Sequence, residues 1–234
     1  MMRRARPIGH VRAWGAATLL AAAWSLAFAQ AGAGGGSAVI FSDDFSQTAV
    51  GAFPDHWTLK GPGAGGNPLS VVQRDGARFL LSQTPVVEGD EQTASTLYAR
   101  LPKQSDMPAV FTIEFDAVFG YSRLADDLQT EKQYGVLAGS ADSSFTLLAV
   151  TSQRAFSRNA QANLNLAAGK VHHVAVTVDG RSVHAHVDTA EVIVDPDGAD
   201  RPITRIGLEL SSHKGAQQDD LMFTNFRIVE GKRP

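Results

Sequence analysis

One stretch of the sequence constrains the fold more than any other. Residues 170–187 read KVHHVAVTVDGRSVHAHV, with Asp179-Gly180 between two runs of alternating apolar and polar residues. An Asp-Gly pair in such a context is the strongest short-range signal for a β-hairpin. A two-residue turn at this pair predicts a register in which His173 faces His186.

Alternation divides this hairpin into two faces, because successive side chains of a strand point to opposite sides. The apolar face consists of Val174, Val176, Val178, Val183, Ala185 and Val187, with His172 at its end. The polar face consists of Ala175, Thr177 and Ser182 with three histidines, His173, His184 and His186. This pattern is typical of an antiparallel sheet that is buried on one side.

The first 29 residues have the pattern of a secretory signal peptide. Four arginines precede an apolar stretch from Trp14 to Leu26, and Ala27-Phe28-Ala29 has the A-x-A form of a cleavage site. The apolar stretch is too short for a comfortable transmembrane helix. We therefore expect no membrane span and an exported protein, periplasmic or extracellular.

The remaining chain suits one domain of an all-β class. Cleavage after residue 29 leaves 205 residues, of which 30–37 form a flexible Gly-rich leader, 38–230 the domain and 231–234 a frayed tail. Loss of the four arginines lowers the formal net charge from −3 to −7, so no nucleic-acid partner is expected. The absence of cysteine excludes disulfides, and stability must come from a large core or from a metal ion.

Further strands are predicted along the whole domain. Val110 to Phe119 gives the cleanest alternation, with Phe111, Ile113, Phe115, Ala117 and Phe119 on one face. Asp75-Gly76 predicts a second hairpin between 69–74 and 77–82, and only 121–132 has a weak helical pattern. Other strands are expected at 38–41, 93–101, 133–140, 145–151, 191–194, 205–210 and 221–229.

The last strand is predicted to contain an irregularity. Leu221 and Phe223 have one parity, whereas Phe226 and Ile228 have the other, so a β-bulge near Thr224-Asn225 is needed if all four face the core. Many short strands separated by turn residues indicate a two-sheet sandwich.

Several motifs in this order resemble a known family. They are DDFS followed by Gly51, Pro54 and Trp57, then FTIEFDAVF, GKVHHVAVTVDGRSVHAHVD, RIGLEL and DDLMFTNFRI. Together they are similar to a laminin-G-like, concanavalin A-type jelly roll of exported bacterial proteins. The resemblance implies two antiparallel sheets, one of them concave, with ligands at the concave face or the rim loops. Members include carbohydrate-binding modules, lectins, adhesion domains and glycoside hydrolases, so the fold alone does not choose the function.

Two carboxylates on one strand suggest catalysis, but the pattern is incomplete. Glu114-Phe115-Asp116 is similar to the opening of the E-x-D-x-x-E motif of laminarinase-type hydrolases. Glycoside hydrolysis needs a pair of carboxyl groups that flank the scissile bond. Phe119 occupies the position of the acid/base glutamate and cannot carry a proton. The alternative is a strand face with two solvated carboxylates.

Three histidines on one face permit a zinc site or contacts to a polar ligand. No acid lies on this face within the hairpin, and Asp188 has the core-facing parity. Zinc-bound histidines usually have such acids as partners. An outer surface that tolerates polar residues is therefore the alternative interpretation.

The resemblance also implies a structural calcium ion where the first and last strands of such jelly rolls meet. Asp43 or Asp44 near Asp219 or Asp220 would supply the oxygen ligands that calcium requires. The alternative is that these acids cap turns. Among the few aromatic residues available for sugar stacking, Trp57 is expected to be a packing residue, and Tyr121 is the better exposed candidate.

The sequence thus favours an exported, non-catalytic module that binds a glycan, an oligosaccharide or polysaccharide, or another cell-envelope polymer. The residues expected to contact the ligand are His173, His184, His186, Glu114, Asp116 and Tyr121. A glycoside hydrolase or polysaccharide lyase of the same fold is one alternative, and a structural envelope or adhesion protein is another. The oligomeric state is left open.

Overall fold

A computed structural model describes residues 37–60, 69–82, 93–102, 107–121, 132–140, 143–212 and 220–231. Residues Ser37–Pro234 form one compact unit. The described residues contain fifteen strands and no helix, so none of their segments is a long apolar helix able to cross a bilayer. The predicted signal peptide, and all but the two end residues of the weak helical segment, lie outside the described residues.

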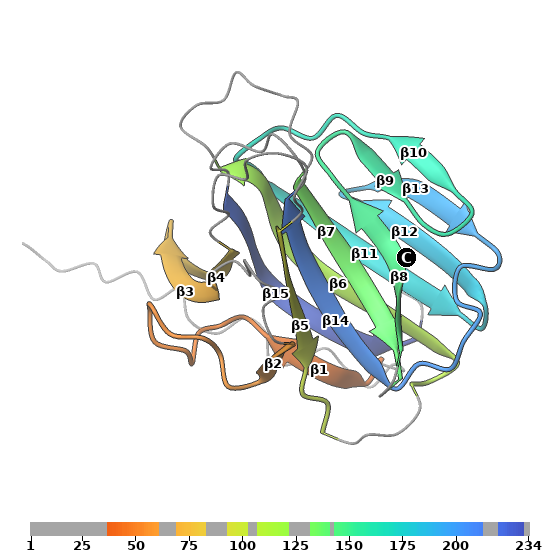
Figure 1. Ribbon diagram of the computed structural model, residues 1–234, viewed down its shortest axis with the longest axis horizontal. Helices are drawn as coiled ribbons and strands as arrows, with labels where there is room; N and C mark the ends of the chain where they lie inside the picture. Colours follow the sequence, from red (N-terminus) through yellow and green to blue (C-terminus); the bar gives the residue numbers. More distant parts are fainter. Residues whose placement is uncertain are drawn as a thin grey trace, which may run out of the picture. The chain divides into compact units, whose positions relative to one another are not determined.

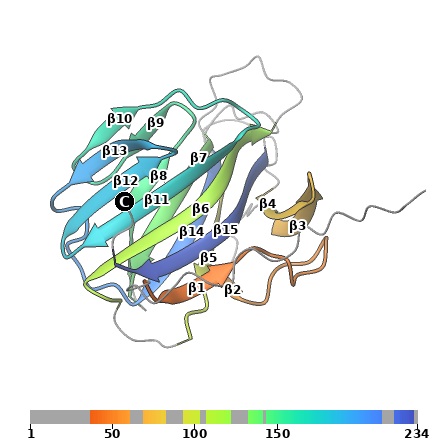
Figure 2. The same cartoon turned by 180° about the vertical axis from the view of Figure 1, so that it is seen from behind.

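The strands form two antiparallel sheets that lie face to face (Figures 1 and 2). The first sheet, nearer the viewer in Figure 2, has the order β13 (Ala190–Asp195), β12 (Ser182–Val187), β11 (Val171–Asp179), β6 (Val110–Tyr121), β15 (Asp220–Glu230), β4 (Ala77–Ser82) and β3 (Leu69–Arg74), with β1 (Val39–Asp43) also paired to β15.

The second sheet is nearer the viewer in Figure 1. Its order is β10 (Gln161–Asn163), β9 (Arg154–Phe156), β8 (Ser144–Val150), β7 (Lys132–Gly139), β14 (Arg205–Ser212), β5 (Thr93–Ala99) and β2 (Trp57–Lys60). The predicted all-β, two-sheet sandwich is confirmed.

The core lies between the sheets and is rich in aromatic rings. All five residues of the predicted apolar face of β6 are at most 1% exposed. Trp57 is fully buried, as expected for a packing residue, and its ring lies 4.9 Å from that of Phe226 and 5.5 Å from that of Phe41. These edge-on contacts join β1, β2 and β15, so the first residues of the domain are fixed by its last strand.

Tyr134 of β7 connects the two sheets through its hydroxyl group. The hydroxyl lies 2.7 Å from the carbonyl oxygens of Val118 in β6 and Met222 in β15. Burial raises the pKa of this phenol well above its ordinary value. The contact satisfies a polar group inside an otherwise apolar core.

The hairpin at Asp75-Gly76 has the predicted turn. Asp75 has φ of 49° and Gly76 has φ of 83°, as a two-residue type I′ turn requires at both central positions. Val72 therefore faces Phe79, as the sequence predicts.

The hairpin at residues 170–187 turns one residue later than predicted. Asp179 pairs with Ser182, so the two loop residues are Gly180 and Arg181, of which only Gly180 has positive φ, at 60°. Glycine at the first loop position is the signature of a type II′ turn. Asp179 is used as a strand residue because it also pairs with Val110 of β6.

This shift corrects the predicted register of the histidines. His186 faces Ala175 rather than His173, and His184 faces Thr177. Each residue of β12 therefore pairs with a residue of β11 two positions away from the predicted one. A register shift of two keeps every side chain on its predicted face. Val174, Val176 and Val178 are accordingly buried.

The predicted bulge in the last strand is present. The register between β15 and β6 shifts between Thr224 and Arg227, and Asn225 has φ of 52°. Phe223 and Phe226 are both fully buried as a result. The bulge leaves the side chain of Asn225 free to point away from the core.

Candidate functional site

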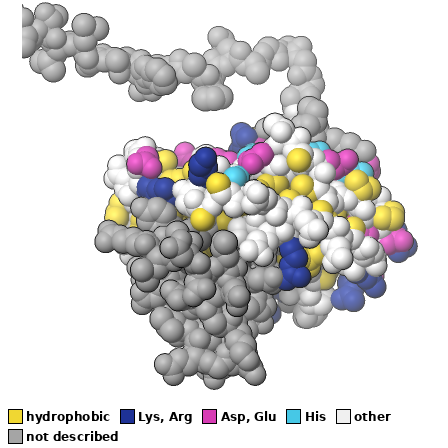
Figure 3. All heavy atoms as spheres, turned by 90° about the horizontal axis from the view of Figure 1, so that it is seen from above, with side chains coloured by type: hydrophobic (Ala, Val, Ile, Leu, Met, Phe, Trp, Pro, Cys, Tyr) yellow, Lys and Arg dark blue, Asp and Glu magenta, His cyan; other side chains and the backbone are white. Residues whose placement is uncertain are grey.

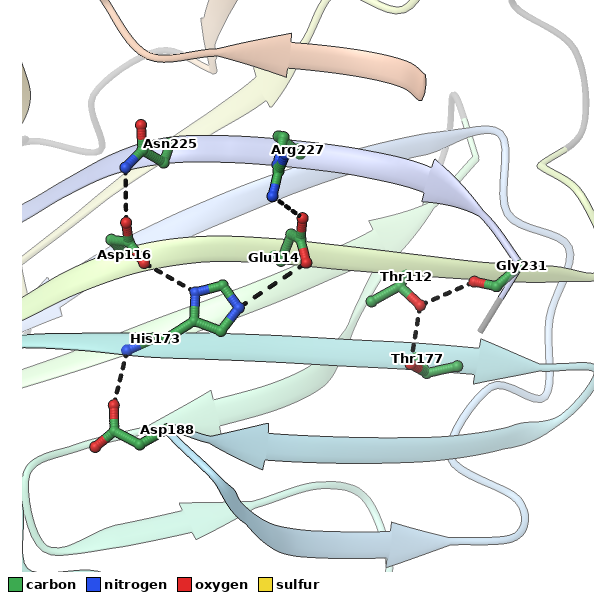
Figure 4. Close-up of polar contacts among 9 residues, drawn as sticks. All are labelled: Thr112, Glu114, Asp116, His173, Thr177, Asp188, Asn225, Arg227 and Gly231. Carbon is green, nitrogen blue, oxygen red and sulfur yellow. Dashed lines mark hydrogen bonds and ion pairs between the residues drawn. The ribbon is translucent and has the colours of Figure 1, made fainter. Parts of the chain in front are cut away.

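A group of charged and polar side chains covers the middle of the first sheet on its outer face. We call it the carboxylate–histidine cluster, and Figure 4 shows its members, Glu114, Asp116, His173, Asn225 and Arg227. They come from the adjacent strands β6, β11 and β15, whose registers place His173 beside Asp116 and Arg227 beside Glu114. Glu114, Asp116 and His173, which the sequence gives as candidate ligand contacts, therefore lie together.

Asp116 is held from two sides. His173 Nδ1 lies 2.8 Å from Asp116 Oδ1, and Asn225 Nδ2 donates a hydrogen bond of 2.7 Å to Asp116 Oδ2. Burial opposes ionisation of Asp116, but the bonds from His173 and Asn225 outweigh it and lower the pKa of the carboxyl group. The hydrogen bond that His173 donates to Asp116 in turn raises the pKa of His173.

Glu114 lies between Arg227 and His173. Arg227 Nη2 is 2.6 Å from Glu114 Oε1, and His173 Nε2 is 3.9 Å from Glu114 Oε2. Glu114 is only 3% exposed. A carboxylate so buried is stable only when cations or donors compensate its lost hydration, and both are present here.

Phe119, at the third position of the motif that resembles the hydrolase pattern, points to the opposite side of β6. It is 1% exposed, and its ring packs 5.0 Å from that of Tyr134 in the core. The two carboxylates thus have no third acid beside them on β6. A general acid for glycoside hydrolysis needs a raised pKa, whereas Asp116 has a lowered one.

The outer face of the second sheet carries a different arrangement around Tyr98. Tyr98 lies across Gly207 of β14, where an added Cβ atom would stand only 2.6 Å from Tyr98 Cδ1. The guanidinium carbon of Arg205 is 4.4 Å from the centre of the tyrosine ring. This is the geometry of a cation–π contact.

Tyr98 and Arg205 border a hollow of about 660 Å³. Its lining is completed by Thr58, Ala99, Arg100, Leu101 and Thr204. A pocket of this size accommodates a small ligand. Sequence reasoning missed this site, although Gly207 between inward Ile206 and Leu208 was a usable signal for a close approach on the outer face.

A second hollow, of about 420 Å³, lies between β8 and the segment after β13. Arg201 stands 6.0 Å above the ring of Phe145, and Asp200 pairs with Arg158 and, at 3.6 Å, with Arg201. Asp200 is thus the shared ion-pair partner of both arginines of this hollow.

Comparison with known proteins identifies solved structures with a similar architecture. No family model and no curated protein sequence matches the chain. Among solved structures, the carbohydrate recognition domain of Emp47p matches with a TM-score of 0.51 at 12% identity, over 84% of this chain and 97% of that one. A glycoside hydrolase family 16 endo-glucanase from Bacteroides ovatus matches with a TM-score of 0.57 at 12% identity, over 81% and 100%. The catalytic domain of a laminarinase from Thermotoga petrophila matches with a TM-score of 0.54 at 11% identity, over 85% and 99%.

The chain has the concanavalin A-like jelly-roll fold. At these identities the likeness concerns the fold alone. The predicted concanavalin A-type jelly roll is confirmed, whereas the laminin-G-like assignment stays a prediction.

Two further histidines of this jelly roll, His172 and His184, also contact acidic side chains. Asp188 has φ of 54°, which brings its carboxylate 2.9 Å from His172 Nδ1 and 3.0 Å from the backbone nitrogen of His173. His184 Nδ1 lies 3.1 Å from Glu191 Oε1 of β13. In the described part of the chain, no three His, Asp or Glu side chains are grouped so as to hold a metal ion.

Two of the four predicted calcium ligands accept hydrogen bonds within turns. Asp43 accepts bonds from the Phe45 backbone nitrogen at 2.8 Å and from Trp57 Nε1 at 3.0 Å. Asp44 accepts a bond of 2.9 Å from the backbone nitrogen of Ser46, and bonding to Ser46 lowers the pKa of this carboxyl group.

His186, which faces Ala175, has no acidic partner among the described residues, and three other predicted site residues are not described in full. Asp219 and the side chains of Asp220 and Tyr121 lie outside the described residues. The calcium site and the ligand role of Tyr121 therefore stay predictions.

Proposed function

We propose that this jelly roll is an exported, non-catalytic domain that binds a glycan. The observation that carries the proposal is the state of the two carboxylates on β6. Glu114 is paired with Arg227, Asp116 is held by His173 and Asn225, and Phe119 is buried where the motif would need an acid. The lowered pKa of Asp116 opposes the protonated form that a carboxylic general acid must have.

The protonation state that hydrolysis requires supports this argument. A retaining or inverting glycosidase keeps one carboxyl group protonated near neutral pH, which demands a raised pKa. Asp116 is shifted in the opposite direction by its hydrogen bonds. Glu114 lies 2.6 Å from Arg227, so this carboxyl group is engaged by a cation within the sheet.

Two further observations support binding. The compared structures of the same fold include a carbohydrate recognition domain as well as glucanases, so the fold is used for both kinds of glycan chemistry. The outer face of the second sheet offers a hollow with an aromatic ring and several hydrogen-bonding side chains. Such convergent polar groups around an apolar surface are what a small-molecule site requires.

The test measures binding and hydrolysis on the same samples. The purified protein is incubated with a panel of neutral and acidic polysaccharides, and bound protein and newly released reducing ends are both quantified. We expect retention on at least one polysaccharide with no reducing ends above the buffer control.

Two results would contradict the proposal. Reducing ends that disappear in an Asp116→Asn variant would establish a hydrolase that uses this carboxylate. Failure to bind any polysaccharide of the panel would favour a structural role in the envelope.

A further inference from the structure

We propose that the hollow around Tyr98 binds an acidic saccharide, whose carboxylate or sulfate group is held by Arg100 and Arg205. This inference rests on the proposed glycan-binding function and names the class of glycan. It is drawn from three features of the outer face of the second sheet: its unpaired cations, its unpartnered polar atoms and the support beneath Tyr98.

The cations of this face have no acidic partners among the described residues. Tyr98 pairs with Gly207, so the same register continued by two residues places Arg100 opposite Arg205. Like charges in facing positions repel one another. Lys60 of β2 is exposed and lies on this face too, because it alternates with Thr58, which faces Tyr98.

The few contacts these cations make serve to orient them. Arg100 Nε donates a hydrogen bond of 3.0 Å to Thr58 Oγ1, and Arg205 Nη2 lies 3.4 Å from the carbonyl oxygen of Ser143. Neither contact removes positive charge. Each guanidinium group therefore keeps donors for an anionic oxygen, which it recognises better than a neutral one.

Two polar atoms beside the hollow lack any hydrogen-bond partner. The hydroxyl of Tyr98 and Nε of Arg205 are both buried and unpartnered in the described structure. Leaving such groups unsatisfied is costly, and native structures rarely do so without a reason. An oxygen of a bound ligand that accepts from both atoms would remove the cost.

Tyr98 is also well supported for a binding role. Gly207 lets the ring lie against β14, since any side chain there would collide with Tyr98 and with the carbonyl oxygen of Leu97, 2.4 Å from the added Cβ. The guanidinium carbon of Arg205 lies 4.4 Å from the centre of the ring. The ring is thereby held against both β14 and a cation at the border of the hollow.

The experiment uses two matched pairs of polymers that differ in charge. Polygalacturonate is compared with its methyl ester, and dextran sulfate with dextran, by calorimetry at one fixed salt concentration. We expect at least one charged polymer to bind about tenfold more tightly than its neutral partner, because charge-assisted hydrogen bonds are about twice as strong as neutral ones. The better of the two pairs distinguishes a carboxylate from a sulfate.

Variants locate the site. Arg100→Gln and Arg205→Gln are each expected to weaken binding of the charged polymer about tenfold. Arg181→Gln is the matched control, because Arg181 is an exposed arginine of the first-sheet hairpin and its loss changes the net charge equally. Equal weakening by all three variants would show non-specific attraction and overturn the proposal.

Tyr98→Phe separates a binding role from a structural one. Removing an unpartnered buried hydroxyl should leave the melting temperature unchanged or raise it, while affinity for the charged polymer falls several-fold. Unchanged affinity in this variant would overturn the role of the hydroxyl. Tight binding of neutral polymers that no variant affects would overturn the acidic-saccharide inference and leave the proposed function standing, whereas no binding at all would overturn both.

Discussion

The two outer faces of the sandwich contain similar charged groups but arrange them differently. On the first sheet, Glu114, Asp116, His173 and Arg227 alternate in sign across three strands and contact one another. Figure 3 shows acidic, basic and histidine side chains close together along one edge of the unit. On the second sheet, Arg100 and Arg205 stand without a described carboxylate beside them.

This difference teaches that a cluster of titratable residues is a poor guide to a binding site when its members satisfy one another. Ion pairs within a face already use the hydrogen bonds that a ligand would need. On the second face, Arg100 and Arg205 have no acidic partner among the described residues, and the buried hydroxyl of Tyr98 has no hydrogen-bond partner there, so such bonds are available. Stability should therefore respond to changes on the first face, and affinity to changes on the second.

The largest effect on stability is expected from Glu114→Ala. The change removes a buried carboxylate and its contact with Arg227, whose side chain is 42% exposed, so we expect the free energy of unfolding to fall by about 2–3 kcal/mol, the range of a hydrogen bond to a charged group. Urea denaturation measures this loss. Binding of any glycan should be unchanged, because the second face is untouched.

A double-mutant cycle provides the control for this prediction. If the two side chains stabilise each other, Glu114→Ala combined with Arg227→Ala costs less than the sum of the single changes. Strict additivity would contradict the coupling. A tenfold loss of glycan affinity in Glu114→Ala would show that the first face binds the ligand and would break the comparison.

A smaller effect on stability is expected at Asn225, where replacement by glycine should cost less than replacement by alanine. Asn225 has φ of 52° and donates to Asp116, so a substitution can remove the hydrogen bond alone or add backbone strain. Asn225→Gly keeps the backbone conformation and should cost about 1 kcal/mol. Asn225→Ala should cost about 1 kcal/mol more, since alanine disfavours this conformation. Thermal unfolding of both variants checks the order, and a more stable alanine variant would contradict the strain.

Local sequence patterns predicted the fold well, because a strand buried on one side alternates apolar and polar residues with a period of two. The apolar face of β6, the turn at Asp75-Gly76 and the bulge at Asn225 all follow from residues close in sequence. The turn after Asp179 lies one residue later than predicted, because the sequence Asp-Gly-Arg permits two turn types. The choice between them depends on pairing with β6, which lies about sixty residues earlier in the chain.

The candidate sites were harder to predict, since they depend on which strands become neighbours. Glu191 reaches His184 only because β13 pairs with β12, and Asp188 reaches His172 only through its left-handed backbone. The site around Tyr98 combines β2, β5 and β14, which are far apart in sequence. Its decisive feature, the lack of acidic partners, has no signature in any single strand.

The smallest expected effect is a dependence of stability on pH that comes from Asp116 and His173 on the first face. Asp116 has a lowered pKa, so its contribution is present above its unfolded value near 3.8 and is lost as the pH falls through the folded value. His173 has a raised pKa, so its contribution is complete below its unfolded value of 6.5 and is lost as the pH rises through the folded value. Both contributions are present together between these two unfolded values.

The alkaline side of this window is the diagnostic one, because several other carboxyl groups with lowered pKa values, among them Asp195 with a pKa of about 2, also lose stability in acid. The side chain of His173 is 44% exposed and Arg227 opposes its protonation, so we expect the loss between pH 5.5 and 8.5 to stay below about 1 kcal/mol. Urea denaturation at both pH values measures it in the wild type and in His173→Gln. An equal loss in the variant would assign the dependence to other groups, whereas a flat profile in the variant alone shows that charge pairing on this face stabilises the fold.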